Sequence, residues 1–227
     1  MNITYIYHSG FLVELDSCIL IFDYYKGSIP EFDHKKPVFV FASHKHHDHY
    51  NPAIYSLRQM DVDVTYVLSD DIRVSKHEEK QEDVVFMGAH EKTNIKMIQV
   101  ETLLSTDEGV AFIVEADGRS IYHAGDLNWW HWNGESGDYN AAMGENYRRE
   151  IDCLKGRHFD AAFVPLDPRL EDKFYLGLDY FMRTADADVV WPMHCWDSPV
   201  VVKKLMELEE SRPYREKIIT EWECNGR

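Results

Sequence analysis

The densest group of chemically active side chains is Ser43-His44-Lys45-His46-His47-Asp48-His49, in which four histidines fall within six residues. It directly follows a continuous apolar run, the pattern of a strand buried on both faces. In an extended segment, side chains two positions apart point the same way, so His44 and His46 can converge on one ion. Asp48 and His49, where the chain turns, can face a second ion. Imidazole and carboxylate suit zinc, manganese or iron, and an incidental polar loop is the less favoured interpretation.

This segment, His44-x-His46-x-Asp48-His49, resembles the HxHxDH signature of the metallo-β-lactamase superfamily. Two later segments resemble further motifs of that family in the expected order: Tyr122-His123-Ala124-Gly125-Asp126 and Pro192-Met193-His194. The three motifs span most of the chain, and together they are more specific than any one alone. The sequence of the middle segment is similar to the corresponding motif in the branch of the family that contains ascorbate-6-phosphate lactonase-like members.

The resemblance implies an α+β protein with a four-layer αβ/βα sandwich and metals at one edge, between two sheets. His44 and His46 would bind the first metal, and Asp48, His49 and His194 the second, with Asp126 bridging the two. Asp48 and Asp126 would then be the catalytic residues, acting with a metal-bound hydroxide as nucleophile. The implied cofactor is one or two divalent ions, with zinc expected first and manganese or iron as alternatives.

One part of the family pattern is missing, because the stretch 101–109 lacks the usual third histidine of the first site. His90 lies too early in the chain to replace it. Three alternatives stay open: Thr106, Asp107 or Glu108 substitutes, water fills the position, or only the second metal binds firmly. A carboxylate ligand would favour a harder ion such as manganese over zinc.

Substrate contacts are predicted next to these motifs. Trp129-Trp130-His131-Trp132 follows the Gly-Asp motif almost directly, and we expect Trp130 and His131 to contact substrate. The alternative is that the tryptophans cover the core beneath a long crossover. Arg169 follows a buried strand, and its planar fork suits a carboxylate or phosphate. An ion pair with Asp167 or Glu171 is the equally weighted alternative.

Two further residues near the N-terminus draw attention. His8 has no partner that the sequence can name. Asp23 stands at a strand end and is expected to contact the site from below.

Composition bounds the kind of partner. The chain has 227 residues, 44% of them hydrophobic, with 24 Lys and Arg against 40 Asp and Glu and a net charge of −16. The electrostatic field of this negative charge repels nucleic-acid phosphates and anionic lipids. We therefore expect a small-molecule substrate and no binding to nucleic acid or to a membrane. No apolar stretch reaches the length of a membrane helix or a signal peptide, and the four cysteines form no CxxC pair. A cytoplasmic protein with reduced thiols is the resulting expectation, and the sequence leaves the oligomeric state open.

The pattern of elements predicts one domain over 1–227. Apolar runs, alternation and turn residues predict strands, and helical periodicity with caps predicts helices. The predicted strands are 3–7, 11–15, 18–22, 38–42, 62–68, 84–87, 95–100, 110–115, 119–123, 161–164 and 189–191. The predicted helices follow Asn51-Pro52, cover 139–155 and 177–185, and follow Ser198-Pro199.

The function expected from this sequence is a metal-dependent hydrolase of small esters, lactones or phosphodiesters. A metal-dependent nuclease is one alternative, which the negative charge disfavours. A metal-binding homologue with a degenerate first site and little catalysis is the other. The presence of both Asp48 and Asp126 disfavours the non-catalytic homologue, because a purely structural metal site has little need of these carboxylates.

Overall fold

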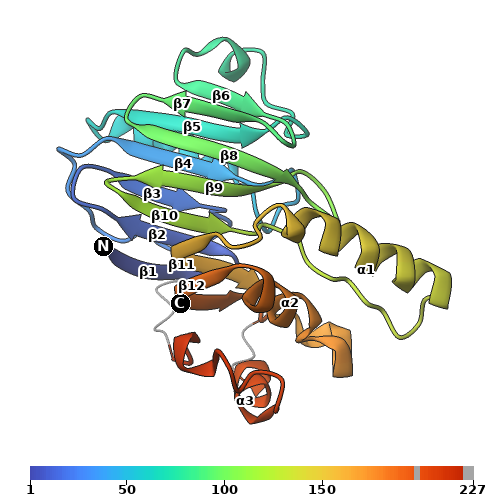
Figure 1. Cartoon of the computed structure of the whole chain (residues 1–227). Coiled ribbons are helices and arrows are strands. Elements are labelled where there is room, and N and C mark those ends of the chain that lie inside the picture. The colour runs from blue at the N-terminus through green and yellow to red at the C-terminus, as the bar shows by residue number, and fades with distance from the viewer. Residues whose placement is uncertain (197–199, 222–227) are drawn as a thin grey trace.

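Two mixed sheets of six strands each form the centre of the molecule, in the computed structural model that describes residues 1–196 and 200–221. The continuous apolar runs of the sequence become central strands whose residues are all buried. The first sheet contains β1 (Asn2–Tyr7), β2 (Gly10–Glu14), β3 (Ile19–Phe22), β4 (Val38–Ala42), β5 (Val64–Ser69) and β6 (Val84–Met87). The second contains β7 (Lys92–Ile95), β8 (Ile98–Leu104), β9 (Val110–Ala116), β10 (Arg119–His123), β11 (His158–Pro165) and β12 (Asp186–Met193) (Figure 1).

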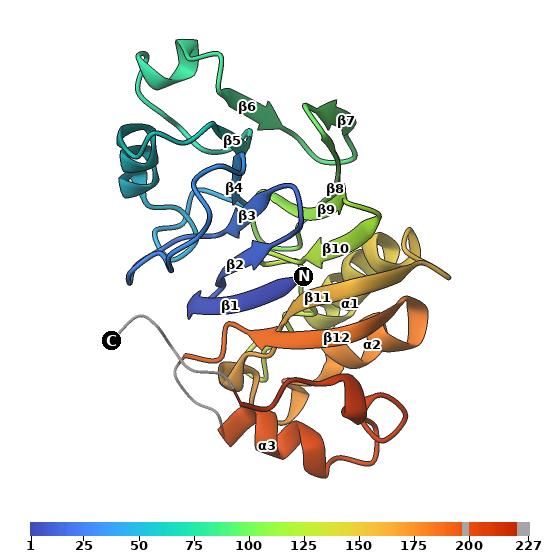
Figure 2. The same cartoon turned by 90° about the vertical axis from the view of Figure 1, so that its left-hand side faces the viewer.

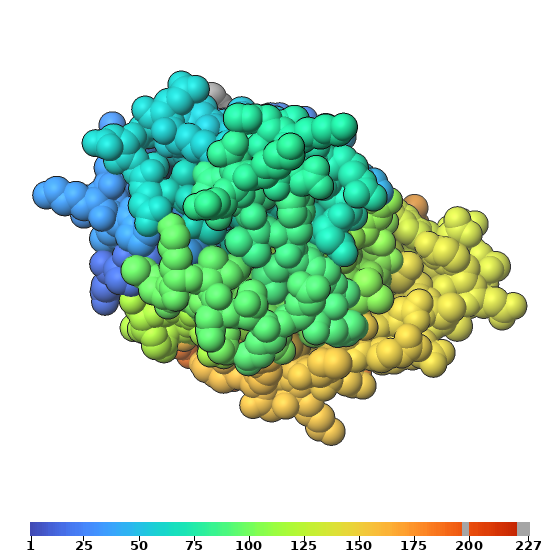
Figure 3. Space-filling view, turned by 90° about the horizontal axis from the view of Figure 1, so that it is seen from above, coloured from blue at the N-terminus to red at the C-terminus, as the bar shows by residue number. Residues whose placement is uncertain are grey.

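Helices form the outer layers and complete the four-layer sandwich that was expected. The second sheet carries α1 (Gly137–Asp152) and α2 (Leu176–Thr184) on its outer side, and α3 (Val200–Glu207) lies beyond its edge strand β12 (Figure 2). The first sheet carries the short 3₁₀ helix Pro52–Gln59. Three shorter 3₁₀ segments are Glu78–Lys80, Pro168–Lys173 and Arg215–Lys217. From above, α1 projects beyond the sheets at one side (Figure 3).

Apolar burial holds these layers together. One large core joins the facing surfaces of the two sheets and continues to the helices over the second sheet, with rings such as Phe11, Phe41 and Phe163 fully buried. A separate core lies under the 3₁₀ helix of the first sheet, where Ile54 and Leu57 pack on the strands. Burying side chains of this size stabilises the fold by about 1.5–3 kcal/mol each.

Strand direction brings the predicted site residues to one edge. In the first sheet, β1 and β3 both run antiparallel to β2, and β4 runs parallel to β3. Their carboxyl ends, which lead into His8, Asp23 and the histidine segment 43–49, therefore meet at the same edge. In the second sheet, β8 and β10 both run antiparallel to β9, and β11 and β12 run parallel to β10. The segments after these strands accordingly meet at one edge as well.

The boundaries of the elements agree with the sequence in most places, with one correction. The single strand predicted at 95–100 is wrong, because a tight turn at Lys96, with φ of 51°, divides that stretch into β7 and β8. The helix predicted after Asn51-Pro52 is present as a 3₁₀ helix, and the Asn51 side chain caps it by accepting a hydrogen bond from the Ala53 amide. The predicted Ser198-Pro199 cap lies outside the described residues.

Two further observations bear on the class of protein. In the described part of the chain, no helix is long and apolar enough to cross a membrane. Cys18, Cys153 and Cys195 are free thiols.

Candidate metal centre

Four side chains form a first group of donor atoms. His44 and His46 follow β4, Asp107 follows β8 and Asp126 follows β10, so both sheets contribute. His44 Nε2 lies 3.0 Å from His46 Nδ1 and 3.5 Å from Asp126 Oδ2. His46 Nδ1 lies 3.6 Å from Asp107 Oδ2. One ligand atom from each of the four residues lies within 4.8 Å of the others, so they can hold one ion.

A second group lies beside the first. It contains Asp48, His49 and His194, the three residues predicted for a second metal, together with His8, for which the sequence named no partner. Their ligand atoms also lie within 4.8 Å of one another. His8 could have been found from topology alone, because a turn after β1 must lie at the same edge as the end of β3.

Asp126 stands between the two groups and presents one carboxylate oxygen to each. Oδ2 faces His44, while Oδ1 lies 3.2 Å from His49 Nε2 and 3.6 Å from His194 Nε2. Burial, opposed by His194 and assisted by Asp107 and other nearby carboxylates, raises the pKa of Asp126 to about 7. A positive ion would offset this crowding of negative charge, and the placement matches the bridging role implied by the resemblance.

Carboxylates and a hydroxyl orient three of the imidazoles. Asp23 accepts hydrogen bonds at 2.7 Å from the Ser43 amide, the Ser43 hydroxyl and His49 Nδ1. The Ser43 hydroxyl in turn lies 3.0 Å from His44 Nδ1. In the tautomer in which each Nδ1 donates these hydrogen bonds, the Nε2 lone pairs of His44 and His49 face the two donor groups, the arrangement usual for metal-binding histidines. Asp23 therefore contacts the site from below, as expected.

Asp167 performs the same task for His194 and was missed as an orienting residue. Its Oδ2 lies 2.8 Å from His194 Nδ1 and also accepts hydrogen bonds from Arg169. Burial alone would raise the pKa of this carboxyl, but the hydrogen bonds from His194 and Arg169 outweigh burial and lower it. The carboxylate thus stays ionised and fixes the ring of His194.

The protonation of His8, His44 and His49 fits a metal centre. Burial lowers the pKa of His8 and of His44 to about 2, and it also lowers the pKa of His49. These imidazoles are therefore neutral near pH 7, which is the form that binds metals. Three buried atoms of the two groups have no hydrogen-bond partner: His8 Nε2, His49 Nε2 and Asp126 Oδ1. Unpaired buried polar atoms are costly, and metal ions placed among them would satisfy all three.

Of the three residues proposed to replace the missing histidine, Asp107 is the one in the first group. The Thr106 hydroxyl is engaged with the backbone of Asn128, as donor at 2.6 Å and as acceptor at 3.0 Å. Glu108 forms an ion pair with Lys45 and lies no closer than 3.9 Å to His46 Nε2. His90 contacts Glu150 instead of the site.

A cavity of about 270 Å³ opens over both groups. Trp130 and Trp132 line one wall with rings stacked 6.0 Å apart, and the Trp130 ring also meets His194 edge-on at 5.6 Å. Trp129 instead packs with Tyr147 in the core, so the tryptophan segment serves both of the roles considered for it.

His131 does not line this cavity. The rings of its two neighbours occupy the wall, and the His131 amide donates to the carbonyl of Trp129. The structure therefore does not bring His131 together with the other predicted substrate contacts.

Arg169 lies at the rim of the cavity and combines both interpretations considered for it. It pairs with the buried Asp167, with 2.6 Å between Nη2 and Oδ2, yet 49% of its side chain is exposed. The guanidinium also lies over the rings of Trp132 and Trp196, at 5.6 and 4.8 Å. Among the described residues, its Nη1 has no hydrogen-bond partner, so one edge of the fork is available to an anion.

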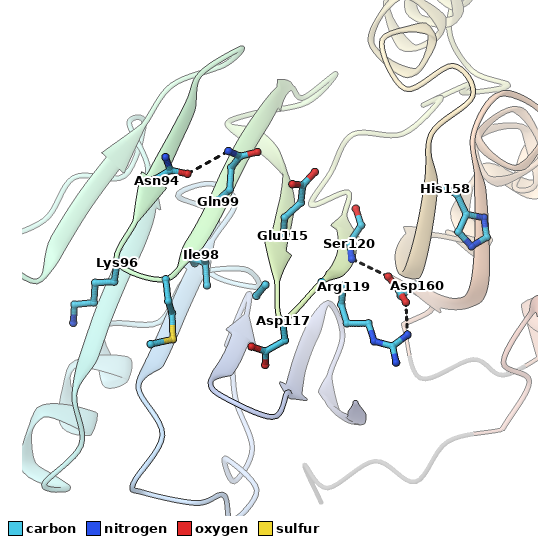
Figure 4. Close-up of a pocket in the computed structure, with 13 residues that line it drawn as sticks. Asn94, Lys96, Ile98, Gln99, Glu115, Asp117, Arg119, Ser120, His158 and Asp160 are labelled. Carbon is cyan, nitrogen blue, oxygen red and sulfur yellow. Dashed lines mark hydrogen bonds and ion pairs between the residues drawn. The ribbon is translucent and has the colours of Figure 1, made fainter.

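A larger cavity of about 580 Å³ lies at the opposite edge of the second sheet, where β8, β10 and β11 begin. Two pairs of its polar side chains bond to one another, Arg119 with Asp160 and Gln99 with Asn94 (Figure 4). Within residues 1–196 and 200–221, neither of the two groups of candidate metal ligands lies at this cavity. The chemistry of the molecule is therefore placed at the smaller cavity.

Comparison with known proteins agrees with this geometry. Residues 2–131 match the family described as beta-lactamase superfamily domain. The structure is similar to a metallo hydrolase from the archaeon Ignicoccus hospitalis, with 17% identity, TM-score 0.62 and coverage of 99% of this chain and 95% of that one. It is also similar to a metal-dependent hydrolase from Parabacteroides distasonis, with 15% identity, TM-score 0.61 and coverage of 96% of this chain and 90% of that one.

A third solved structure with the same fold is the isothiocyanate hydrolase from Delia radicum gut bacteria, with 12% identity, TM-score 0.55 and coverage of 100% and 98%. None of the curated proteins matches. The matched family covers more than half of the chain and includes the histidine segment and Asp126. This chain belongs to the β-lactamase superfamily and has the fold of its metal-dependent hydrolases.

Proposed function

We propose that the protein is a metal-dependent hydrolase of small esters, lactones or phosphodiesters. The observation that carries the proposal is the pair of donor groups joined by Asp126 in the wall of a small cavity that also presents an arginine. Divalent ions at such a place polarise a carbonyl or phosphoryl oxygen and lower the pKa of water. The fold alone would not carry this proposal, because one fold supports many activities.

The residues of the chain supply positioning and proton transfer. Asp48 belongs to the second group and also lines the cavity, so its carboxylate can orient a water molecule and accept its proton. Asp126 holds the two groups at a fixed separation. The stacked Trp130 and Trp132 offer a flat apolar wall, and Arg169 offers one anion contact.

The size and charge of the cavity favour a small substrate. A volume of about 270 Å³ is at the lower end of ligand pockets. One arginine stands among several carboxylates, and the net charge of −16 repels a long polyanion. We therefore infer a substrate with one anionic group and one flat or sugar-like part, and we infer no role with nucleic acid.

The donor set also bears on the metal. The first group offers two imidazoles and two carboxylates, and oxygen ligands suit manganese or iron better than a histidine-rich set does. We infer that the first position takes one of these ions more readily than zinc. The second group, with three histidines, is compatible with zinc.

The experiment is metal analysis of protein purified without added metal, followed by assays of lactones, phosphodiesters, esters and thioesters with zinc, manganese or iron. Asp48→Ala and His194→Ala should lose metal and activity together, while His47→Ala, whose side chain is 83% exposed, should keep both. Activity on lactones would also support the resemblance to the lactonase-like branch. Activity on structured RNA with none on small molecules would instead promote the nuclease alternative, and absence of all activity from metal-loaded protein would overturn the proposal.

A further inference from the structure

His8 is a buried imidazole that the signature motifs do not account for. It lies in the turn between β1 and β2 with 4% of its surface exposed, and its Nε2 has no hydrogen-bond partner. The nearest carboxylate oxygen, Asp48 Oδ2, is 3.5 Å away, which is too long for a good hydrogen bond. A buried nitrogen left in this state is costly unless something outside the chain satisfies it.

The surroundings of this nitrogen are those of a metal ligand. Asp48, His49 and His194 each place a ligand atom within 4.8 Å of it and of one another. An ion with bonds of about 2.1 Å holds neighbouring tetrahedral ligands about 3.4 Å apart. The 3.5 Å between His8 Nε2 and Asp48 Oδ2 matches that spacing.

The backbone at His8 adopts a conformation that costs free energy. Its φ is +58°, in the left-handed region that residues other than glycine seldom adopt. Its carbonyl accepts a hydrogen bond from the amide of His194, and the two rings lie 4.2 Å apart. His194 itself has a φ of +61°. Strained backbone of this kind persists where surrounding contacts enforce it, and it concentrates at ligand-binding sites.

We propose that His8 Nε2 is a ligand of the second metal, beside Asp48, His49 and His194. The inference rests on the proposed metal-dependent function. Oδ1 of Asp126 also faces this position, so the second site has five protein donors, and their side chains are at most 15% exposed. In the first site, the side chains of His46 and Asp107 are 42% and 44% exposed. A metal site whose ligands are all protein atoms holds its ion firmly, whereas a catalytic site leaves one position for water or substrate. The second metal is therefore the firmly held ion, and the first is the exchangeable ion that faces substrate.

The test uses cobalt(II) alone as the probe, added to chelator-stripped full-length protein. Calorimetry gives the number and affinity of the sites, and the visible absorption reports the coordination of the bound ion. The main variant is His8→Asn, because asparagine tolerates positive φ and so leaves the turn unstrained by the substitution. The matched control is His47→Ala, a histidine of the same cluster whose side chain is solvent-exposed.

Wild-type protein and the control should show one tight and one weaker site. His8→Asn should weaken the tight site by at least about 100-fold, the upper end of what losing an orienting partner costs, and should change its spectrum. Thermal unfolding of the metal-free proteins checks that the variant folds, and His8→Ala serves as a second variant. Unchanged affinity and spectrum in a folded His8 variant would overturn this inference alone. Absence of cobalt binding by the wild type would overturn the proposed function as well.

Discussion

At the scale of residues, the site is organised by carboxylates that do different work. Asp48, Asp107 and Asp126 face the two donor positions, whereas Asp23 and Asp167 stand behind histidines and fix their rings. The two kinds respond differently to substitution. Loss of a facing carboxylate removes a ligand, and loss of an orienting one weakens the ligand in front of it.

Asp107 is the residue to change in the first group. Asp107→Ala should abolish the weaker of the two metal sites, because His44, His46 and Asp126 alone leave the first position short of a donor. Asp107→His should restore binding and shift the preference toward zinc. Calorimetric titration with manganese and with zinc measures both effects. The control is Glu108→Ala, which removes only the ion pair with Lys45, and equal metal loss in that control would refute the assignment.

Asp23→Asn tests the orienting role. Asparagine keeps only one accepting oxygen, so its NH2 group must face either the Ser43 amide or the Ser43 hydroxyl and His49 Nδ1. Metal affinity should fall about 10- to 100-fold without loss of any ligand. Calorimetric titration with manganese measures the change, and Asp63→Asn, at an exposed ion pair with Lys96, should leave it unaltered. Wild-type affinity in Asp23→Asn would show that His49 needs no such partner.

At the scale of elements, α1 is fitted to the loop that carries the tryptophans. A Cβ atom built on Gly144 would lie 2.6 Å from the ring of Trp129, so the helix approaches that ring as closely as a glycine allows. Arg148, one turn further along, stacks its guanidinium 4.7 Å from the same ring. The helix thereby fixes the start of the loop whose next residue, Trp130, lines the cavity.

Gly144→Ala should destabilise the protein by about 1–3 kcal/mol, because overpacking outweighs the better helix propensity of alanine. Gly137→Ala in the same helix is the matched control, since nothing lies within 4 Å of its added Cβ. That control should change stability by less than about 1 kcal/mol, in the favourable direction. Urea unfolding measures both. Equal stability of the two variants would mean that Trp129 yields without cost.

The sequence predicted most of these elements because buried strands appear as continuous apolar runs and their ends carry the chemistry. The strand before His44 and the one before Asp126 are found with correct bounds for that reason. The sequence could not predict that Asp107, and not Thr106 or Glu108, supplies the fourth donor of the first group, because this depends on the path of a short loop. The place of His8 depended on the direction of β1 in the sheet. Neither the path of a loop nor the direction of a strand in its sheet can be read from the local pattern of apolar and polar residues.

At the scale of the whole molecule, stability should depend on metal. The two donor groups place several buried atoms and carboxylates together that an ion would satisfy. At a free ion concentration about 100 times the dissociation constant, one site adds about 2.7 kcal/mol. For a chain of this size, that raises the melting temperature by roughly 5–10 °C.

Differential scanning calorimetry with and without manganese checks this dependence. Asp126→Asn, at the carboxylate that faces both groups, should lose most of the increase. Asp160→Asn, at the opposite edge beside Arg119, should keep it. An equal increase in both variants would mean that manganese binds elsewhere.

The division of ligands between the sheets has a consequence for how the chain is held together. The first sheet supplies His8 and the histidine segment, and the second supplies Asp107, Asp126 and His194. An ion held by both is a reversible cross-link between the two halves of one chain, and it closes a long loop as a disulfide would. The free-metal level of the surroundings would therefore act on the sandwich as redox potential acts on a disulfide, since it would set the fraction of molecules that carry this cross-link in addition to the shared apolar core.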